Sequence, residues 1–255
     1  MIDLAPHNPY SVPLRSPVLV ATGCAMRELD VSQVGAVLTR TVTVHTRHLP
    51  PPCWAATPAG LLLSHRPTIS VRTLLRDDAR RWSRSTAPVW ASVLGNGDEL
   101  LETVSRLAGV EGLAGLVLEI EGLFSGRVVH AIRTRTLLPL LVTLPLVPDA
   151  APLAQELVAA GADALCVAAA PHAAMLQDGS VLAGGLYGPA VMPLVLHQLS
   201  LVRSVVEVPL VAQGGISDLA MARDYLAAGA SALLVDAARW GEPFVAQRLA
   251  AQLQA

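Results

Sequence analysis

One stretch, Val208–Trp240, constrains the fold of this chain more than any other. Its apolar run Pro209–Ala212 stops at Gly214 and Gly215, and a helical pattern of apolar residues follows, opened by residues of helix N-cap type. A second apolar run, Ser231–Val235, comes next. A strand, a glycine turn, a helix and a strand within about 30 residues are typical of a parallel βαβ unit. The stretch therefore predicts two neighbouring parallel strands joined by a crossover helix.

The glycine turn of this unit lies at the carboxyl end of its first strand, a place that suits a phosphate. Glycines leave the backbone amides unobstructed, and the positive end of the helix dipole favours an anion. In (β/α)8 barrels a phosphate usually lies after strands 7 and 8. If Pro209–Ala212 and Ser231–Val235 are those two strands, six more strands should precede them.

The rest of the chain supplies six short apolar runs separated by helical patterns. The runs are Pro17–Thr22, Gly35–Arg40, Pro88–Val93, Leu113–Glu121, Leu138–Leu144 and Ala162–Ala168. The helices expected among them are Val71–Ser85, Asp98–Leu107, Ser125–Thr136, Asp149–Ala160 and Pro189–Val206. A length of 255 residues is usual for one such domain. We therefore predict an α/β fold, a single-domain (β/α)8 TIM barrel over residues 1–255.

Three segments fall outside this alternation of strands and helices. Ser11–Arg15 is expected to be a short strand that closes the floor of the barrel. The stretch from Val42 to about Ser70 is rich in proline and is expected to be irregular, and a loop is expected from Ala168 to Gly188. Loops of this length are usually functional or disordered.

Charge, hydropathy and cysteine spacing bound the function. A net charge of −2 gives no reason to expect nucleic acid or an anionic membrane as a partner. The longest uncharged apolar stretch, Thr136–Pro148, is too short to span a bilayer, and residues 1–16 do not resemble a signal peptide. The three cysteines lack metal or redox spacing, so we expect no metal and a reducing, cytoplasmic location. All 18 basic residues are arginine, so no lysine is present to act in catalysis.

Several motifs, in order along the chain, resemble those of the dihydroorotate dehydrogenases, FMN-dependent (β/α)8 enzymes of pyrimidine synthesis. The motifs are Leu14–Gly23, Gly35–Thr43, Thr57–Gly60, Gly184–Pro193, Gly214–Ile216 and Ala227–Val235. The resemblance implies FMN as cofactor and oxidation of dihydroorotate as activity. It also implies a set of flavin-binding positions, which are Ala21, Thr22, Gly23, Arg40, Thr41, Thr143, Gly188, Gly214, Gly215, Asp236 and Ala237.

The departures from the family pattern lie where the chemistry should occur. Glu119–Phe124 replaces the segment that carries the family's Cys or Ser base, and it holds neither residue. The two flavin-side lysines of the family are Arg40 and Thr143 here, and Asp236 brings a negative charge to the phosphate end. The asparagines expected to bind the substrate ring fall on Leu63 and within Ala168–Ala170. We therefore expect little or no dihydroorotate oxidation and weak binding of FMN.

Two glutamates are the candidate catalytic residues. Glu119 and Glu121 alternate with apolar neighbours, so both side chains should lie on one face at the carboxyl end of the fourth expected strand. They could act as a relocated general base or as a cation site, or they could fill a vacated pocket as part of an ion pair. Arg40 ends the second expected strand, and we predict that it contacts Glu119 or Glu121 as a structural plug.

Other candidates have a functional and a structural interpretation each. Cys24 could be a reactive thiol or a small buried residue, and His65 and His172 could be bases or solvated loop residues. A run of arginines could bind a phosphate or an acidic partner or form a solvated helix face. The run comprises Arg66, Arg72, Arg76, Arg80, Arg81 and Arg84.

Two classes of function remain open from the sequence. One is an FMN oxidoreductase of the dihydroorotate dehydrogenase type with a relocated base, acting on dihydroorotate or a related small substrate. The other is a catalytically degenerate relative that serves as a binding protein or as the partner of another subunit. We expect the chain to bind a small-molecule ligand. We also expect it to associate with either a second copy of itself or a partner subunit.

Overall fold

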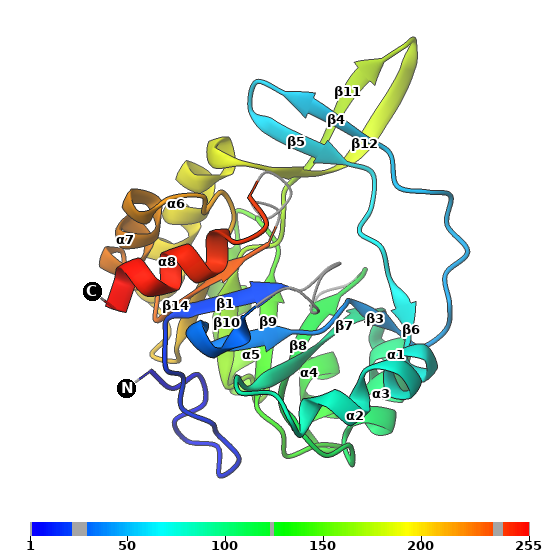
Figure 1. Cartoon of the computed structure of the whole chain (residues 1–255), viewed down its shortest axis with the longest axis vertical. Coiled ribbons are helices and arrows are strands. Elements are labelled where there is room, and N and C mark those ends of the chain that lie inside the picture. Colours follow the sequence, from blue (N-terminus) through cyan, green and yellow to red (C-terminus); the bar gives the residue numbers. More distant parts are fainter. Residues whose placement is uncertain (1, 22–29, 123–124, 237–241, 255) are drawn as a thin grey trace.

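A closed barrel of eight parallel strands forms the body of the protein, seen here in a computed structural model that describes residues 2–21, 30–122, 125–236 and 242–254 (Figure 1). The strands are β1 (Val18–Ala21), β2 (Ala36–Leu38), β7 (Val89–Gly95), β8 (Leu113–Ile120), β9 (Leu140–Leu144), β10 (Ala164–Val167), β13 (Leu210–Gln213) and β14 (Ala232–Val235). The ring closes because β1 pairs with both β14 and β2, and β2 pairs with β7. The predicted (β/α)8 barrel and all eight expected strands are confirmed.

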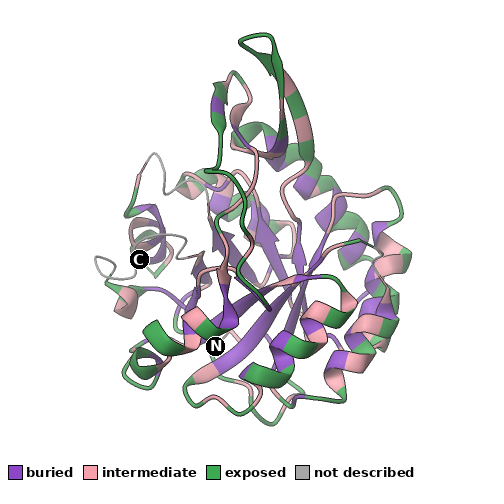
Figure 2. Cartoon of the chain, turned by 90° about the vertical axis from the view of Figure 1, so that its right-hand side faces the viewer, coloured by how far each residue is buried: buried purple, intermediate pink, exposed green. Residues whose placement is uncertain are grey.

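Helices cover the outside of the barrel and turn their buried faces toward it (Figure 2). They are α1 (Val71–Asp77), α2 (Ala79–Trp82), α3 (Gly97–Leu107), α4 (Gly126–Arg133), α5 (Ala150–Ala159), α6 (Met192–Arg203), α7 (Leu219–Ala227) and α8 (Val245–Gln254), with 3₁₀ turns η1 (Val31–Gln33) and η2 (Pro189–Val191). The helix expected over Val71–Ser85 is divided at Asp78, so α1 and α2 are separate.

Two helix starts differ in how they are capped. Asn96 caps α3 through a reciprocal pair of hydrogen bonds with Glu99, the capping box. Ser125, which precedes α4, makes no side-chain cap bond. Instead, Oε1 of Glu156 on α5 accepts a hydrogen bond from the Gly126 amide at 2.6 Å. The first turn of α4 is therefore completed by its neighbour.

The barrel interior is a packed apolar core. Trp90 on β7 is fully buried there, and Gly115 on the adjacent β8 makes room for it, because a Cβ at Gly115 would lie 2.5 Å from the indole ring. Leu4 and Leu14 belong to the same core and close the floor. The strand expected over Ser11–Arg15 is wrong, because this segment makes only an isolated bridge between Leu14 and Ile2. Close packing rather than a continued strand closes that end.

A second, four-stranded antiparallel sheet projects from the carboxyl end of the barrel (Figure 1). It consists of β4 (Trp54–Thr57), β5 (Gly60–Leu63), β11 (His172–Gln177) and β12 (Ser180–Tyr187), and we call it the roof sheet. Short strands β3 (Val42–Thr43) and β6 (Ile69–Ser70) extend the barrel sheet beside β7. The loop expected from Ala168 to Gly188 is therefore wrong over most of its length, whereas the stretch from Val42 to Ser70 is irregular outside its four short strands.

The roof sheet forms because two distant hairpins can approach closely. Leu61–Leu63 pairs with Gly185–Tyr187 across the seam between β5 and β12. A Cβ at Gly184 would lie 1.9 Å from the carbonyl oxygen of Leu63, so only glycine fits there. At the tip of the other hairpin, Asp178 (φ 49°) and Gly179 (φ 77°) have the positive φ angles of a type I′ turn. Glycines thus set both the turn and the seam.

Candidate functional site

A layer of polar side chains lies directly above the apolar barrel core, at the carboxyl ends of the strands. Each member follows a core residue by two positions, so it points the same way one layer higher. The layer consists of Ser92, Glu119, Thr143, Gln213 and Asp236, which follow Trp90, Val117, Leu141, Val211 and Leu234. We call these five residues the polar layer, and the space above it the mouth of the barrel.

Glu119 is the most strongly engaged member of the polar layer. Its Oε1 accepts a hydrogen bond from the Ser92 hydroxyl at 3.3 Å, and its Oε2 accepts one from the guanidinium of Arg66. Ser92 also lies 3.5 Å from the hydroxyl of Thr41, a predicted flavin position. Only 15% of the Glu119 side chain is exposed, against 33% for Arg66. The Arg66–Glu119 pair therefore lies where a ligand would enter.

The remaining members of the polar layer lie near Cys166 of β10, a buried residue of the barrel core. Its thiol donates to Oε1 of Gln213 at 3.2 Å, and Nε2 of Gln213 donates to Oδ2 of Asp236 at 2.9 Å. Thr143 also forms a hydrogen bond with the thiol. Burial raises the pKa of Cys166, and Glu119 and Asp236 raise it further. This cysteine is therefore a protonated thiol and a poor nucleophile.

Electrostatics keep the other groups of the mouth in fixed charge states. The carboxylate of Glu119 raises the pKa of Arg66, and Tyr187 and Asp236 act in the same direction. Burial raises the pKa of the Tyr187 phenol to about 12, although Arg66 opposes the shift. Arg66 is thus a permanent cation and Tyr187 is a neutral phenol at neutral pH. Neither can exchange a proton readily during a reaction.

Glu121 lies at the rim and has a different arginine as its partner. Nη1 and Nη2 of Arg47 donate to its two carboxylate oxygens at 2.8 and 2.5 Å, a bidentate pair. Nη2 of Arg47 also donates to Glu99 at 3.2 Å. The hydrogen bonds with Glu121 are the main cause that raises the pKa of Arg47. Both candidate glutamates therefore lie in ion pairs.

The prediction that Arg40 is the partner of these glutamates is wrong. Strand β2 ends at Leu38, before position 40, and the Arg40 guanidinium instead meets Asp78 at 2.8 Å, between α1 and α2. Sequence reasoning missed Arg47, and it considered Arg66 only as part of an arginine run, because it left the stretch from Val42 to Ser70 unplaced. The signal available there was two arginines in the stretch that follows the second strand, matching two glutamates at one strand end.

The glycines predicted to bind phosphate pack against one another. A Cβ at Gly215 would lie 2.8 Å from the carbonyl oxygen of Gly188, and one at Gly188 would lie 2.7 Å from Cα of Gly60. The Gly214 carbonyl accepts a hydrogen bond from Tyr225 at 2.8 Å. The start of α7 is capped by Asp218, whose Oδ1 accepts from the Met221 amide. Close backbone packing accounts for Gly60, Gly188 and Gly215.

Several described positions of the implied flavin set are engaged by other side chains of this chain. The cation at position 40 is engaged by Asp78, and Thr143 is engaged by Cys166. Asp236 places a carboxylate near the turn that would hold the phosphate, which removes binding energy. Ala21 ends β1 as expected, whereas Thr22, Gly23, Cys24 and Ala237 lie outside the described residues.

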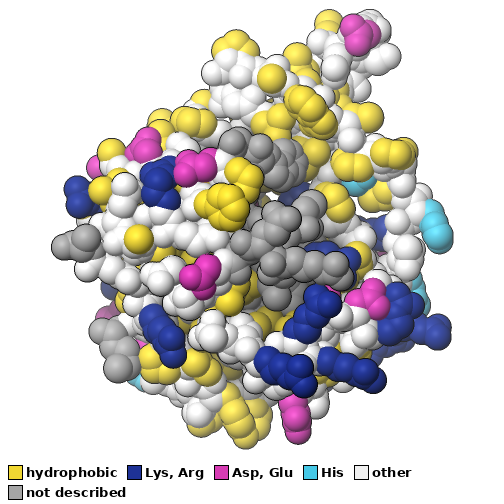
Figure 3. Space-filling model, in the orientation of Figure 1, with side chains coloured by type: hydrophobic (Ala, Val, Ile, Leu, Met, Phe, Trp, Pro, Cys, Tyr) yellow, Lys and Arg dark blue, Asp and Glu magenta, His cyan; other side chains and the backbone are white. Residues whose placement is uncertain are grey.

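The hydrogen bonds of the remaining described candidates do not involve Glu119. Nδ1 of His65 is 3.0 Å from the hydroxyl of Ser64, and His172 is exposed on β11. The arginines of α1, α2 and the turn after them are exposed, and they gather on one side of the molecule (Figure 3). In the described ranges, His, Cys, Asp and Glu form no group of three that could hold a metal. Nor is any helix within those ranges both long and apolar enough to cross a membrane.

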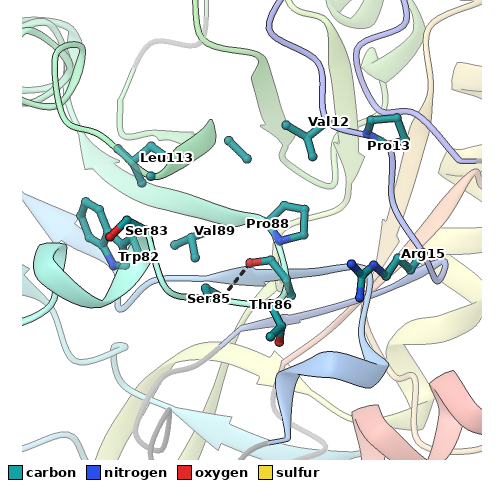
Figure 4. Close-up of a pocket in the computed structure, with 13 residues that line it drawn as sticks. Val12, Pro13, Arg15, Trp82, Ser83, Ser85, Thr86, Pro88, Val89 and Leu113 are labelled. Carbon is teal, nitrogen blue, oxygen red and sulfur yellow. Dashed lines mark hydrogen bonds between the residues drawn. The ribbon is translucent and has the colours of Figure 1, made fainter.

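A pocket of about 440 Å³ lies at the opposite end, on the floor (Figure 4). Residues of the N-terminal segment, the α2–β7 connection and the start of β8 line it, among them Pro13, Arg15, Trp82, Pro88 and Leu113. The lining contains no Asp, Glu, His or Cys. The mouth, which brings carboxylates, hydroxyls and a guanidinium together, is therefore the candidate functional site.

Comparison with known proteins gives a consistent set of similarities. The family model for dihydroorotate dehydrogenase matches residues 124–255, just over half of the chain. The catalytic subunit of dihydroorotate dehydrogenase B (NAD(+)) from Desulforudis audaxviator is 33% identical over 94% of this chain and 88% of its own length. The subunit of the same name from Pelobacter propionicus is 30% identical, over 95% of this chain and 90% of its own length.

Proposed function

The chain belongs to the dihydroorotate dehydrogenase family, which is FMN-dependent, and on that premise we propose that it is a divergent member with little or no dihydroorotate oxidation. One observation carries the proposal. The carboxylate nearest to where a base would act, that of Glu119, accepts hydrogen bonds from Arg66 and Ser92 on its two oxygens. Glu121, the other carboxylate at that strand end, has both of its oxygens bound to the guanidinium of Arg47.

The chemistry explains why this arrangement disfavours the reaction. Oxidation of dihydroorotate requires a base that takes the C5 proton as hydride leaves C6, and a positioned base contributes about 10²–10⁴-fold. Each oxygen of Glu119 already accepts a hydrogen bond, so a substrate C–H would have to approach a carboxylate that Arg66 and Ser92 partly cover. Cys166 is protonated and buried, so it does not substitute.

Weak binding of FMN is the second part of the proposal. The engagement of Arg40 by Asp78 and the carboxylate of Asp236 support it, because both remove favourable charge from the flavin positions. Protein purified without added cofactor should therefore show little flavin absorbance. Tight, stoichiometric FMN in such a preparation would contradict this part of the proposal.

A partner subunit is the third part, and it rests on the relatives, which are named catalytic subunits. A homodimer is the alternative assembly, and mass measurement of the purified protein in solution distinguishes the two.

The unpaired Cys53 and Cys166 support a reducing, cytoplasmic location.

An active oxidoreductase with a relocated base is the alternative function, and the position of Glu119 at the mouth favours it. Turnover of dihydroorotate with a dye acceptor, in the presence of excess FMN, separates the two functions. We expect a rate at least about a hundredfold below that of the Desulforudis audaxviator subunit, since a missing base costs about that much. A rate within about tenfold of that subunit, abolished by Glu119→Gln, would establish the alternative.

A further inference from the structure

Residues 44–69 leave the barrel after β3, build β4 and β5 of the roof sheet and return at β6. The outgoing leg, residues 44–53, carries Arg47, and the return leg, residues 64–68, carries Arg66. The two legs are fastened to the same strand end by the Arg47–Glu121 and Arg66–Glu119 pairs. The two glutamates of β8 thus anchor both connections of the hairpin to the barrel.

The return leg depends on side chains for its position. Within the described part of the chain, residues 65–68 neither donate nor accept a backbone hydrogen bond. The leg is bounded by β5, which pairs with β12, and by β6, which pairs with β3. Between these fixed ends, the side-chain hydrogen bonds of the leg are those of Ser64 with the Cys53 amide, His65 with Ser64 and Arg66 with Glu119. Only the last of these reaches the barrel.

We infer that the Arg66–Glu119 contact is a latch that holds the return leg across the mouth and shields the polar layer and the nearby Cys166 thiol from solvent. The two ends of the latch come from different parts of the fold, so its release moves the leg without breaking a backbone pair. The barrel strands and the roof seam stay intact when it opens.

The Arg47–Glu121 pair, which we call the outer pair, differs from the latch in its number of hydrogen bonds and in its exposure to solvent. Arg47 makes three hydrogen bonds to two carboxylates, whereas Arg66 makes one, to Glu119. Glu121 is also more exposed than Glu119, 41% against 15%, so the outer pair covers little. Arg47 therefore holds its leg at the rim, and its loss does not open the mouth.

Cys166 is a natural reporter of this opening. It is fully buried, and its thiol is close enough to Arg66 and Glu119 for both to act on its pKa. Removing the positive charge of Arg66 makes the thiolate less stable, so electrostatics alone would slow modification of this cysteine. Greater access would speed modification. The two effects of losing Arg66 have opposite signs, so a faster rate identifies access.

The test measures the rate at which iodoacetamide modifies Cys166 in the full chain with Cys24 and Cys53 replaced by serine. Cys166 in Arg66→Gln should be modified about fivefold faster than in the parent, the upper end of the gain in open population that loss of such an ion pair gives. Arg66→Lys, which keeps the charge, should stay within about twofold of the parent. Arg47→Gln is the matched control, and its rate should equal that of the parent.

Salt and urea separate local opening from unfolding. Raising NaCl from about 0.1 to about 1 M should increase the rate of Cys166 modification in the parent, because salt screens the latch. The rate in Arg66→Gln should stay unchanged. The faster rate in Arg66→Gln should be nearly independent of urea at low concentration, since local opening exposes little surface. The latch is refuted if Cys166 is modified no faster in Arg66→Gln than in the parent, or if Arg47→Gln raises the rate equally. It is also refuted if the rate depends on urea as global unfolding does.

Discussion

The barrel wall and the roof sheet are held together by different means. Each barrel strand pairs on both sides in a closed ring, over an apolar core filled by Trp90 and its neighbours. The roof sheet has two edges, and its halves meet at a seam three residues long, fixed by glycines and by the ion pairs of the legs below. Barrel stability therefore rests on burial, whereas roof stability rests on close backbone approach and on charge.

The largest effect should come from the barrel side of this comparison. Trp90→Ala removes a fully buried indole from the barrel interior and leaves a cavity beside Gly115. We expect the free energy of unfolding to fall by about 3–5 kcal/mol, measured by urea denaturation. Trp54→Ala on the roof is the matched control, because 62% of Trp54 is exposed, and it should cost less than about 0.5 kcal/mol. Equal losses for the two variants would abolish the distinction.

A smaller and local effect should follow from Gly184→Ala. The new Cβ would clash with the Leu63 carbonyl, so the seam between β5 and β12 must separate, at a cost of about 1–3 kcal/mol. Hydrogen exchange of the Leu61–Leu63 amides should accelerate, while the amides of β9 and β10 keep their protection. Gly179→Asn, at the open tip of the hairpin, is the control and should leave the seam protected. Loss of protection in the barrel as well would show that roof and wall unfold as one unit.

The smallest effect concerns pH and Tyr187, at one end of the seam. Its folded pKa, about 12, is above the unfolded value of about 10, so the folded state holds the proton more tightly. The resulting stability is complete below about pH 10 and is lost as pH rises toward 12. Between pH 9 and 11.5, the free energy of unfolding of Tyr187→Phe should therefore fall by up to about 2 kcal/mol less than that of the parent. If the stability of the two proteins depended on pH in the same way, burial would not raise the pKa of this phenol.

These differences also explain what the sequence could predict. The barrel strands are local apolar runs, such as Leu138–Leu144, and their helices follow directly, so neighbouring residues were enough to place them. The roof strands contain Gly, Ala and Leu, and β5 pairs with residues more than 120 positions away. No local pattern encodes that pairing, and the glycines at the seam resemble loop residues.

The candidate site shows the same division. Alternation along β8 placed Glu119 on the inner face at the mouth, two positions after Val117 of the barrel core, whereas Glu121 lies beyond the end of the strand at the rim. Their partners depended on where the 44–69 stretch returns to the barrel, and on the break at Asp78 that draws Arg40 away. Strand periodicity determines which way a side chain points within a strand, whereas the partner in an ion pair depends on how separate elements pack together.

The cap that Glu156 provides for α4 has a consequence for the order of folding. Because Ser125 does not cap α4, the Gly126 amide has no side-chain partner until α5 has docked beside it. A ribosome that has released only the chain up to β9 therefore presents an α4 whose first turn is incomplete and prone to fray. The fourth and fifth βα units must consequently mature together during synthesis, and a fragment divided between them would separate a helix from its own cap.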